Sequence, residues 1–220
     1  TYSQRAETYY DRQIAKLYFH YQNILFKNNA VDFDDLLVYS VRLFLESPDI
    51  LKIYQNRFRY ILVDEYQDTN RPQYLFIKKL AEIHRNICVV GDDDQSIYTW
   101  RGADIRNILD FEVDYPDASV IRLEQNYRST QVILDAGNAV IRNNFGRKEK
   151  KLWTDRIGGE KIRIKDCLDE VEEAWWIART IQDLFQSGAY QYKNMAVLYR
   201  TNAQSRALEE GMRKATIPYM

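Results

Sequence analysis

The stretch that decides the fold is ILVDEYQDTN, Ile61 to Asn70. The apolar run Tyr60 to Val63 has the composition of a buried strand, and two carboxylates, Asp64 and Glu65, follow it directly. Because ligands of open parallel sheets bind beyond the carboxyl ends of the strands, these carboxylates are expected at a binding crevice. There, Asp64 can hold Mg²⁺ through its water shell while Glu65 orients or deprotonates an attacking water. The simpler alternative is a strand that ends in acidic residues at a solvated edge.

Apolar runs and amphipathic segments alternate beyond this stretch. Further strands are predicted at Ile87 to Val90, Val120 to Leu123, Ile162 to Lys165 and Met195 to Tyr199. The predicted helices are Pro72 to Ile83, Ala103 to Phe111, Ser129 to Ile141, Glu170 to Phe185 and Ala203 to Lys214. Buried strands separated by helices indicate an α/β protein with a parallel sheet covered on both faces.

The first fifty or so residues are predicted to be helical. Between Arg5 and Leu25, apolar residues recur every three or four positions. The positions expected to face inward are Ile14, Leu17, Tyr18, Tyr21 and Leu25. A second helix is expected after Asp32, with the inward positions Leu36, Leu37, Val41 and Phe44. Ser47 and Pro48 have the residue types of the N-cap and first position of a third helix.

Composition limits the classes of function. The 220 residues carry 31 Lys and Arg against 32 Asp and Glu, so a polyanion would have to be bound by local patches rather than by a global basic field. The basic run Arg147 to Lys151 is expected to be a solvated loop. Cys88 and Cys167 lack the spacing of metal ligands, and Cys88, in ICVVG, is expected in the core. This cysteine usage fits a reducing, cytoplasmic location, and no apolar run approaches transmembrane length.

The loop after the next predicted strand, GDDDQSIYTWRGAD from Gly91 to Asp104, combines two chemistries. Its acidic end leads to Gln95, a neutral amide that can reach a phosphate oxygen or a water. Its other end carries Tyr98 and Trp100, which offer flat faces to bases, and Arg101, which can pair with a phosphate. The alternative is that the two aromatic residues are core residues two positions apart on a strand.

A third motif, LEQNYRST from Leu123 to Thr130, leads from a strand end into a helix whose N-cap is expected at Ser129 or Thr130. Tyr127 can stack on a purine, and Arg128 can neutralise charge that develops on a transferred phosphoryl group. The alternative is an arginine in a helix-start turn that contacts no ligand.

Five stretches in the same order and at about the same spacing resemble those of the superfamily one DNA helicases of the UvrD, PcrA and Rep type. They are VDFDDLL (31 to 37), ILVDEYQDTN, GDDDQSIYTWRGAD, RLEQNYRST and AVLYRTNAQSR (196 to 206). The resemblance covers essentially the whole chain. It implies partial RecA-like units of the P-loop NTPase class, preceded by an N-terminal helical arm.

The resemblance implies roles for the nucleotide-binding residues. Asp64 matches the Mg²⁺-associated Asp of the family and Glu65 its catalytic Glu, which also lies at the metal. Gln95 matches the glutamine that senses the γ-phosphate of ATP, and Arg128 matches the arginine that contacts it. Tyr127 matches the residue beside the adenine. The implied cofactors are therefore ATP and Mg²⁺.

The resemblance also implies contacts with single-stranded DNA. Tyr98, Trp100 and Arg101 match the motif that stacks on and grips the strand. Arg200 and Asn202 match DNA-contacting positions of the second motor domain. The expected partners are single-stranded DNA and duplex/single-strand junctions, with repair or replication proteins as further candidates and no membrane. The expected location is the bacterial cytoplasm, with the nucleoid.

The family's motor has two RecA-like domains that close on ATP and step along one strand, typically 3′ to 5′. By this analogy, 1–30 is the end of an insertion in the first motor domain, 31–123 the latter part of that domain, and 124–220 the first part of the second. Exposed sheet edges of a half-built domain could drive swapping or dimerisation.

A phosphate-cradling loop needs a glycine-rich turn that ends in Lys-Ser or Lys-Thr. None of the eight glycines begins one, since Gly158-Gly159-Glu160-Lys161 is followed by Ile162. The P-loop is expected before Thr1 and the later arginine motif after Met220, so this segment alone is expected not to hydrolyse ATP. Two alternatives stay open: the motor part of a helicase-nuclease complex, and a degenerate, non-hydrolysing module that binds DNA or protein.

Overall fold

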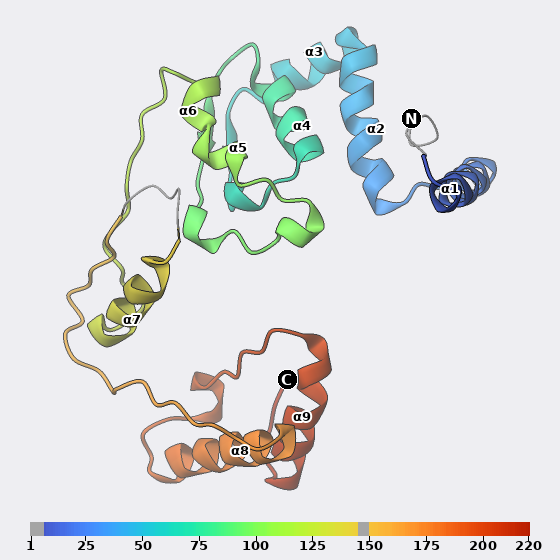
Figure 1. The fold of residues 1–220 in the computed structure, drawn as a ribbon. Helices are drawn as coiled ribbons and strands as arrows, with labels where there is room; N and C mark the ends of the chain where they lie inside the picture. Colours follow the sequence, from blue (N-terminus) through green and yellow to red (C-terminus); the bar gives the residue numbers. More distant parts are fainter. Residues whose placement is uncertain (1–6, 145–149) are drawn as a thin grey trace. The chain divides into compact units, whose positions relative to one another are not determined.

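In the computed structural model, residues 7–144 and 150–220 are described. The chain divides into two compact units, the first ending at Gly159 and the second beginning at Glu160 (Figure 1). Each unit is an assembly of helices, and the first also contains a parallel sheet. The predicted α/β class is therefore confirmed at the level of its elements.

Three helices open the first unit: α1 (Tyr9–Lys27), α2 (Phe33–Glu46) and α3 (Pro48–Arg57). Thr8 and Asp32 cap the first two through reciprocal hydrogen bonds with the third helical residue, and Pro48 begins the third. These starts follow from local sequence chemistry, and the helices predicted here are confirmed. Arg5, the expected start of the first helix, lies outside the described residues.

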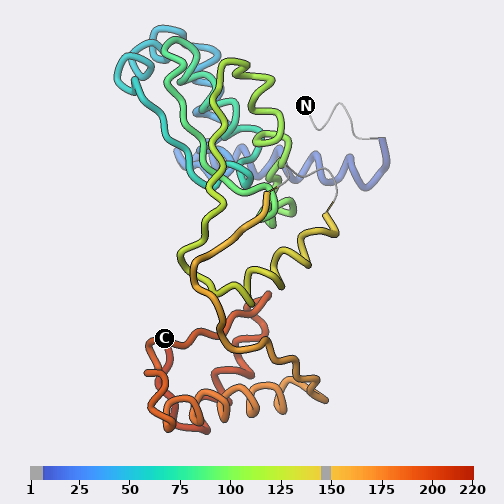
Figure 2. Tube along the Cα trace, turned by 90° about the vertical axis from the view of Figure 1, so that its left-hand side faces the viewer, coloured from blue at the N-terminus to red at the C-terminus, as the bar shows by residue number. Residues whose placement is uncertain are grey.

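The inward faces predicted for these helices are only partly confirmed. In α2, Val41 and Phe44 are buried, but Leu36 is exposed. In α1, which Figure 2 shows along its length, Leu17 is 70 % exposed and Tyr18 is also exposed. The periodicity of apolar residues correctly predicted helix α1. Burial of its apolar face would need a partner surface, and the rest of the described chain does not provide one.

The sheet consists of β1 (Ile61–Val63) and β2 (Ile87–Val89), joined by α4 (Arg71–Ala81) in a parallel crossover. On one side lies an apolar core in which Phe44, Leu51 and Leu80 pack with Ile61 and Phe76. Helices α2, α3 and α4 contact one another beside this sheet (Figures 1 and 2).

The other side of the sheet is open. Leu62 pairs with Cys88 across the two strands, and both residues are exposed. The predictions that the sheet is covered on both faces and that Cys88 is a core residue are therefore wrong for the described chain. The reason is geometric: alternate residues of a strand face opposite sides, and α2 to α4 cover one of them.

Further elements lie between and after the two strands. They are η2 (Tyr66–Asp68), η3 (Asp93–Gln95), η4 (Thr99–Arg101), α5 (Arg106–Leu109), α6 (Phe111–Asp114) and α7 (Gln131–Ile141). The single helix predicted from Ala103 to Phe111 is instead α5 and α6, because Asp110, with φ −94° and ψ 9°, leaves helical geometry at their junction. The N-cap of α7 is Thr130, as predicted, although its side chain makes no capping hydrogen bond.

Three predicted strands, at 120–123, 162–165 and 195–199, are not strands among the described residues. Their apolar side chains are largely exposed, with Ile164 at 90 % and Leu198 at 93 %. A β-strand is completed by hydrogen bonds to a neighbouring strand, and none of these segments pairs with one in the described chain. Their composition is suited to a strand, but composition alone does not form a ladder.

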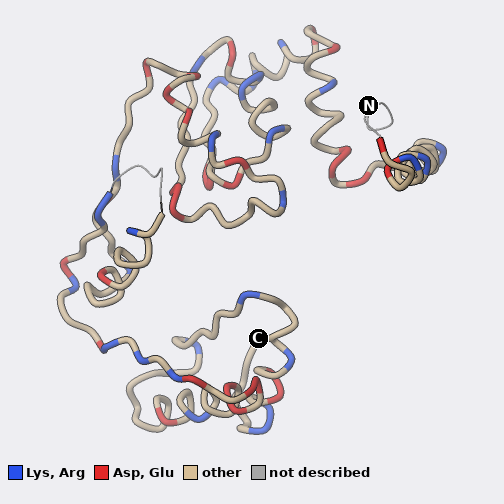
Figure 3. Tube along the Cα trace, viewed as in Figure 1, with Lys and Arg blue, Asp and Glu red and all other residues tan. Residues whose placement is uncertain are grey.

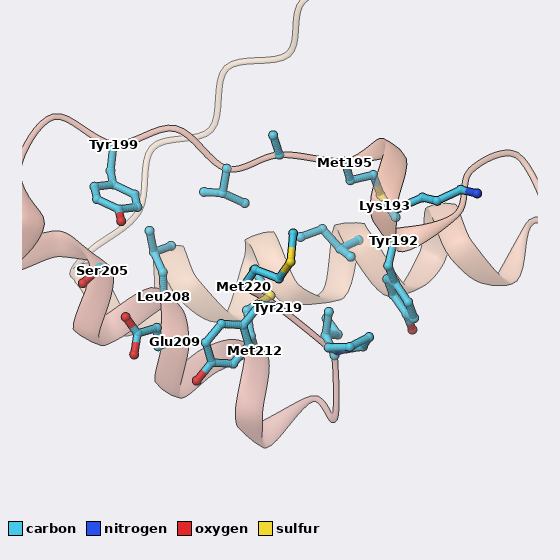
Figure 4. Close-up of a pocket in the computed structure, with 15 residues that line it drawn as sticks. Tyr192, Lys193, Met195, Tyr199, Ser205, Leu208, Glu209, Met212, Tyr219 and Met220 are labelled. Carbon is cyan, nitrogen blue, oxygen red and sulfur yellow. The ribbon is translucent and has the colours of Figure 1, made fainter.

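The second unit is built on α8 (Glu170–Gln186) and α9 (Ser205–Lys214), with the short turns η5 (Tyr192–Asn194) and η6 (Asn202–Gln204). Ala178, Met212 and Ile217 form its buried centre. The helices approach closely at Gly211, where an added Cβ would lie 3.0 Å from that of Ala174. Beside this core is an open, mainly apolar hollow of about 760 Å³ (Figure 4).

Charge is distributed along the described chain rather than collected in one part. Basic and acidic residues are interspersed along the trace (Figure 3). Within the described residues, no helix combines the length and the apolar character needed to cross a membrane.

Candidate nucleotide and DNA site

The two carboxylates of the opening motif lie where β1 ends. Glu65 has φ 50° and ψ 42°, a left-handed conformation that is uncommon for a residue with a side chain, and its N–H donates to Asp64 Oδ1 at 2.9 Å. This conformation turns the chain from the strand directly into η2. Both carboxylates are exposed beyond the carboxyl end of the strand.

The parallel pairing brings a second loop beside the first. Val90 N–H donates to Val63 O at 2.8 Å, and Tyr66 N–H donates to Val90 O at 3.0 Å. The segment that begins at Gly91 therefore leaves the sheet next to Glu65 and the turn that follows it. The resulting site is a property of two neighbouring strands, which explains why residues about 25 positions apart in sequence can act together.

A buried amide joins the two loops. Gln67, 1 % exposed, donates from Nε2 to Glu65 Oε2 at 2.7 Å and accepts from the Asp92 N–H at 3.0 Å. Asp92 in turn accepts from Gln95 Nε2 at 2.7 Å. The predicted residues Glu65 and Gln95 are thus brought into one hydrogen-bonded chain through Gln67 and Asp92, neither of which was singled out as a site residue from the sequence.

A second buried contact ties the far end of the same loop to the motif. Asn107 Nδ2 donates to Thr69 O at 2.9 Å and to Thr69 Oγ1 at 3.1 Å, while Thr69 Oγ1 donates to Tyr66 O at 2.7 Å. Asp104 N–H also donates to Thr69 O at 3.0 Å. Thr69 lies inside the quoted motif and could have been singled out there, whereas Asn107 carried no sequence signal.

The three aspartates at the acidic end of the loop Gly91 to Asp104 all pair with the ammonium group of one lysine, Lys150. The carboxylate oxygens of Asp92, Asp93 and Asp94 lie within 4.8 Å of one another. Lys150 Nζ pairs with Asp92, with Asp93 at 3.2 Å and with Asp94 at 3.4 Å. Burial lowers the pKa of Lys150, but the hydrogen bonds and charges of Asp92 and Asp93 outweigh it, so the net pKa is raised.

Lys150 corrects one prediction. The run Arg147 to Lys151 was expected to be a solvated loop, yet the Lys150 side chain is largely buried against the aspartates. The part of that run from 147 to 149 lies outside the described residues. An ion pair between residues so far apart in sequence depends on chain topology, which charge patterning does not predict.

The donor set at these loops fits a magnesium ion. Mg²⁺ takes oxygen ligands and is usually held through one or two carboxylates with retained waters. Asp64 is exposed, and its Oδ1 accepts a hydrogen bond from the Glu65 N–H. Its Oδ2 could accept a hydrogen bond from a metal-bound water. Asp64 could therefore hold such an ion through a water, with Glu65 beside it.

The aromatic end of the loop is an exposed cluster. Tyr98 and Trp100 have ring centroids 6.4 Å apart, and the Arg101 guanidinium lies 4.5 Å from the Trp100 ring centre. Trp100 is 73 % exposed and belongs to the turn η4, which ends at Gly102 with φ 84°. The alternative that these are core residues on a strand is therefore wrong, and most of the Trp100 side chain is exposed to solvent.

Tyr127 and Arg128 are placed differently. Asn126 Oδ1 accepts from the N–H groups of Arg128 and Ser129 at 3.0 and 2.7 Å, and Arg156 Nη1 donates to Arg128 O at 2.6 Å. Tyr127 is 77 % exposed, with its hydroxyl donating to Gln125 Oε1 at 2.7 Å. The backbone is therefore held, the two side chains point to solvent, and none of these bonds reaches Asp64, Glu65 or Gln95.

Arg200 and Asn202 lie in the second unit, on the turn before α9. Arg200 N–H donates to Gln204 Oε1 at 3.1 Å, and Asn202 begins η6. Both residues are exposed. The apolar hollow of this unit is lined by residues such as Tyr192, Met212 and Tyr219 (Figure 4), and neither Arg200 nor Asn202 lines it. The hollow is therefore not a polar ligand site built from these residues.

Comparison with known proteins gives concordant matches over both halves of the chain. Residues 1–116 match the family model described as the UvrD/REP helicase N-terminal domain, and 121–220 match the UvrD-like helicase C-terminal domain. The chain is 53 % identical over 214 residues to the ATP-dependent DNA helicase PcrA of Staphylococcus aureus (strain NCTC 8325 / PS 47), covering 97 % of this chain and 29 % of that protein. It is also 53 % identical over 218 residues to PcrA of Bacillus subtilis (strain 168), covering 99 % and 30 %. The chain thus spans less than a third of the length of these curated relatives.

Proposed function

The chain belongs to the UvrD/REP helicase family, and we propose that it is part of a longer ATP-dependent DNA helicase that moves 3′ to 5′ on single-stranded DNA. In this proposal, 31–123 is the latter part of one RecA-like motor domain, 124–220 the first part of a second, and 1–30 the end of a helical insertion. Support comes from the parallel crossover β1-α4-β2 with both acidic loops at its carboxyl end. The whole protein would act in the cytoplasm on single strands and junctions during replication, repair or recombination.

The nucleotide site would use the residues at the two strand ends. Asp64 would hold Mg²⁺ through a water, and Glu65 would orient and deprotonate the water that attacks the terminal phosphate. Gln95 would donate to a γ-phosphate oxygen, and Arg128 would neutralise charge in the transition state, with Tyr127 against the adenine. The bound ion would supply electrostatic neutralisation of the phosphates.

The strand would be held by the other end of the same loop. Tyr98 and Trp100 would stack on bases, which stabilises binding by roughly 1 to 3 kcal/mol per base and needs no sequence readout. Arg101, held over both rings, would pair with a phosphate. Arg200 and Asn202 would contact the strand from the second unit.

One observation carries the proposal. The hydrogen-bonded chain Glu65–Gln67–Asp92–Gln95 ends six residues or fewer from Tyr98, Trp100 and Arg101, on one continuous loop. A change at the terminal phosphate would therefore be transmitted by a short, tied segment to the aromatic cluster. Such a segment is what a motor needs to link nucleotide state to its grip on DNA.

The test is ATP hydrolysis and strand unwinding by the full-length protein and its Glu65→Gln variant. We expect DNA-stimulated, Mg²⁺-dependent ATPase activity that falls by about 10²- to 10⁴-fold in the variant, because the general base is removed. Binding of the nucleotide should persist, since Gln keeps the shape of Glu. A full-length protein that binds DNA without any hydrolysis would instead support a non-hydrolysing binding module.

The chain 1–220 by itself should not hydrolyse ATP, because it has no glycine-rich phosphate loop ending in Lys-Ser or Lys-Thr. Phosphate release by the purified chain, with the Glu65→Gln variant as the control, measures this. Robust hydrolysis that disappears in the variant would contradict it.

A further inference from the structure

The most completely buried large side chain of the described residues is polar. Gln67 is 1 % exposed, although an amide is costly to bury unless its hydrogen-bonding groups are satisfied. Its donor goes to Glu65 Oε2 and its acceptor to the Asp92 N–H, at 2.7 and 3.0 Å. The orientation of the amide follows from these partners, because a backbone N–H can only donate and the carboxylate only accept.

We infer that Gln67 is a positioning residue for the hydrolysis step, setting the Glu65 carboxylate relative to the loop that carries Gln95. This inference rests on the proposed function and deepens it. Gln67 would touch neither nucleotide nor metal. It would act through Glu65, by holding one carboxylate oxygen so that the other points to the water, and through Asp92, whose side chain holds Gln95.

The backbone at Gly91 is an independent observation in favour of this role. A Cβ added there would lie 2.5 Å from Gln67 Oε1 and 2.8 Å from Ile108 Cδ1. The amide therefore lies directly against a backbone position that has no side chain. This close approach explains how Oε1 reaches the next N–H along the loop, that of Asp92.

A second buried glutamine shows what a purely structural amide looks like in the same unit. Gln55, 4 % exposed, donates from Nε2 to Lys79 O at 2.8 Å and so joins α3 to α4. Its bond ends on a backbone carbonyl of a helix. Gln67 differs because its donor ends on the side chain proposed to activate water. Gln55 is therefore a matched control.

The experiment compares Gln67→Met, Gln67→Glu and Gln55→Met in the full-length protein. Gln67→Met keeps volume but removes both bonds, so kcat for ATP hydrolysis should fall about 10- to 100-fold while KM stays within about twofold. Gln55→Met removes a comparable buried bond, and its kcat should stay within about twofold of wild type. Thermal unfolding of all variants separates loss of folded protein from loss of turnover.

Gln67→Glu is a second, isosteric variant. It keeps the acceptor for the Asp92 N–H but replaces the donor to Glu65 with a carboxylate, which repels the Glu65 side chain. Its kcat at neutral pH should also fall about 10- to 100-fold while KM stays within about twofold.

The outcomes are separable. An unchanged kcat in Gln67→Glu, or equal kcat losses in Gln67→Met and Gln55→Met, would overturn the positioning role while the helicase function stands. A wild-type protein without Glu65-dependent hydrolysis would overturn the proposed function itself. If Gln67→Met does not fold, the isosteric Gln67→Glu still decides the question.

Discussion

Two regions carry residues proposed for the nucleotide site, and they are built in opposite ways. The loops from Asp64 to Asn70 and from Gly91 to Gln95 leave paired strands and are joined by the buried side chain of Gln67. The segment from Glu124 to Thr130 has a fixed backbone but exposes Tyr127 and Arg128 to solvent. The first region is assembled by contacts between distant parts of the chain, whereas the second leaves two side chains exposed, with the Tyr127 hydroxyl bonded two residues away to Gln125 Oε1.

The sharpest test of this contrast is Arg128→Ala in the full-length protein. Because its side chain is exposed and its backbone makes the structural bonds, the free energy of unfolding should change by less than about 0.5 kcal/mol. ATP turnover should fall by about 10³-fold if Arg128 neutralises transition-state charge. Steady-state kinetics and urea unfolding measure the two effects.

Arg156→Ala, which removes a donor to the Arg128 carbonyl, is the control for indirect damage. Unchanged turnover in Arg128→Ala would remove this residue from the site.

Substitution in the aromatic cluster of Tyr98, Trp100 and Arg101 should likewise change ligand binding rather than the stability of the fold. Trp100→Ala should weaken single-strand binding by roughly 1 to 3 kcal/mol, because a stacking surface is lost. Its effect on stability should be small, since the ring is 73 % exposed. Fluorescence anisotropy with a labelled oligonucleotide gives the affinity. Trp175→Ala, an exposed tryptophan of α8, is the matched control and should leave binding unchanged. Equal losses in both variants would argue against stacking at Trp100.

Where Gly91 packs against the buried Gln67 side chain, a substitution should instead lower the stability of the fold. Gly91→Ala should lower the free energy of unfolding by roughly 1 to 3 kcal/mol, because the new Cβ overlaps Gln67 Oε1 and Ile108 Cδ1. Gly137→Ala is the control: within α7, nothing lies within 4 Å of the added Cβ, and alanine favours a helix by about 1 kcal/mol. Urea unfolding of the chain compares the two. A Gly91→Ala chain as stable as wild type would show that the contact with Gln67 relaxes freely.

The smallest expected effect is on the pH dependence of stability. Burial raises the pKa of Asp114, but hydrogen bonds from Lys78 and Tyr74 outweigh it, so the net pKa lies below the usual value. A depressed folded-state pKa contributes stability that is present above the unfolded-state pKa of about 3.9 and is lost as pH falls through the folded value. Asp114→Asn should therefore lower the free energy of unfolding by on the order of 1 kcal/mol near pH 6 and change it hardly at all near pH 2. Urea unfolding across this range tests it, and a difference that does not depend on pH would contradict it.

Much of the site could be predicted because its residues follow strands. Asp64 and Glu65 come directly after one apolar run and Gln95 lies in the loop after the next, and the carboxyl ends of parallel strands lie at one edge of a sheet. The exposure of Trp100 was harder to predict. Tyr98 and Trp100 are two positions apart, a spacing that would also place them on the same buried face of a strand. The turn η4 and Gly102 decided between the two interpretations.

The missed residues share a physical cause. Gln67, Asn107 and Lys150 act through partners 25 or more positions away in sequence. Periodicity and capping describe contacts within a few residues, so they carry no information about such pairs. The same reason explains the strands that were predicted at 120–123, 162–165 and 195–199 but did not form, because a strand depends on a distant neighbour.

The sequence by itself determined where α1, α2 and α4 start, where β1 and β2 lie, and which side chains follow them, because capping bonds, hydrophobic periods and strand composition are local. Thr8, Asp32 and Asn70 cap their helices with bonds that span three residues. Only the tertiary structure decided that Gln67 joins Glu65 to Asp92, that Lys150 lies on the aspartates, and that Leu62 and Cys88 stay exposed. Those outcomes depend on which surfaces the chain brings together, and burial and pairing are properties of the assembled chain.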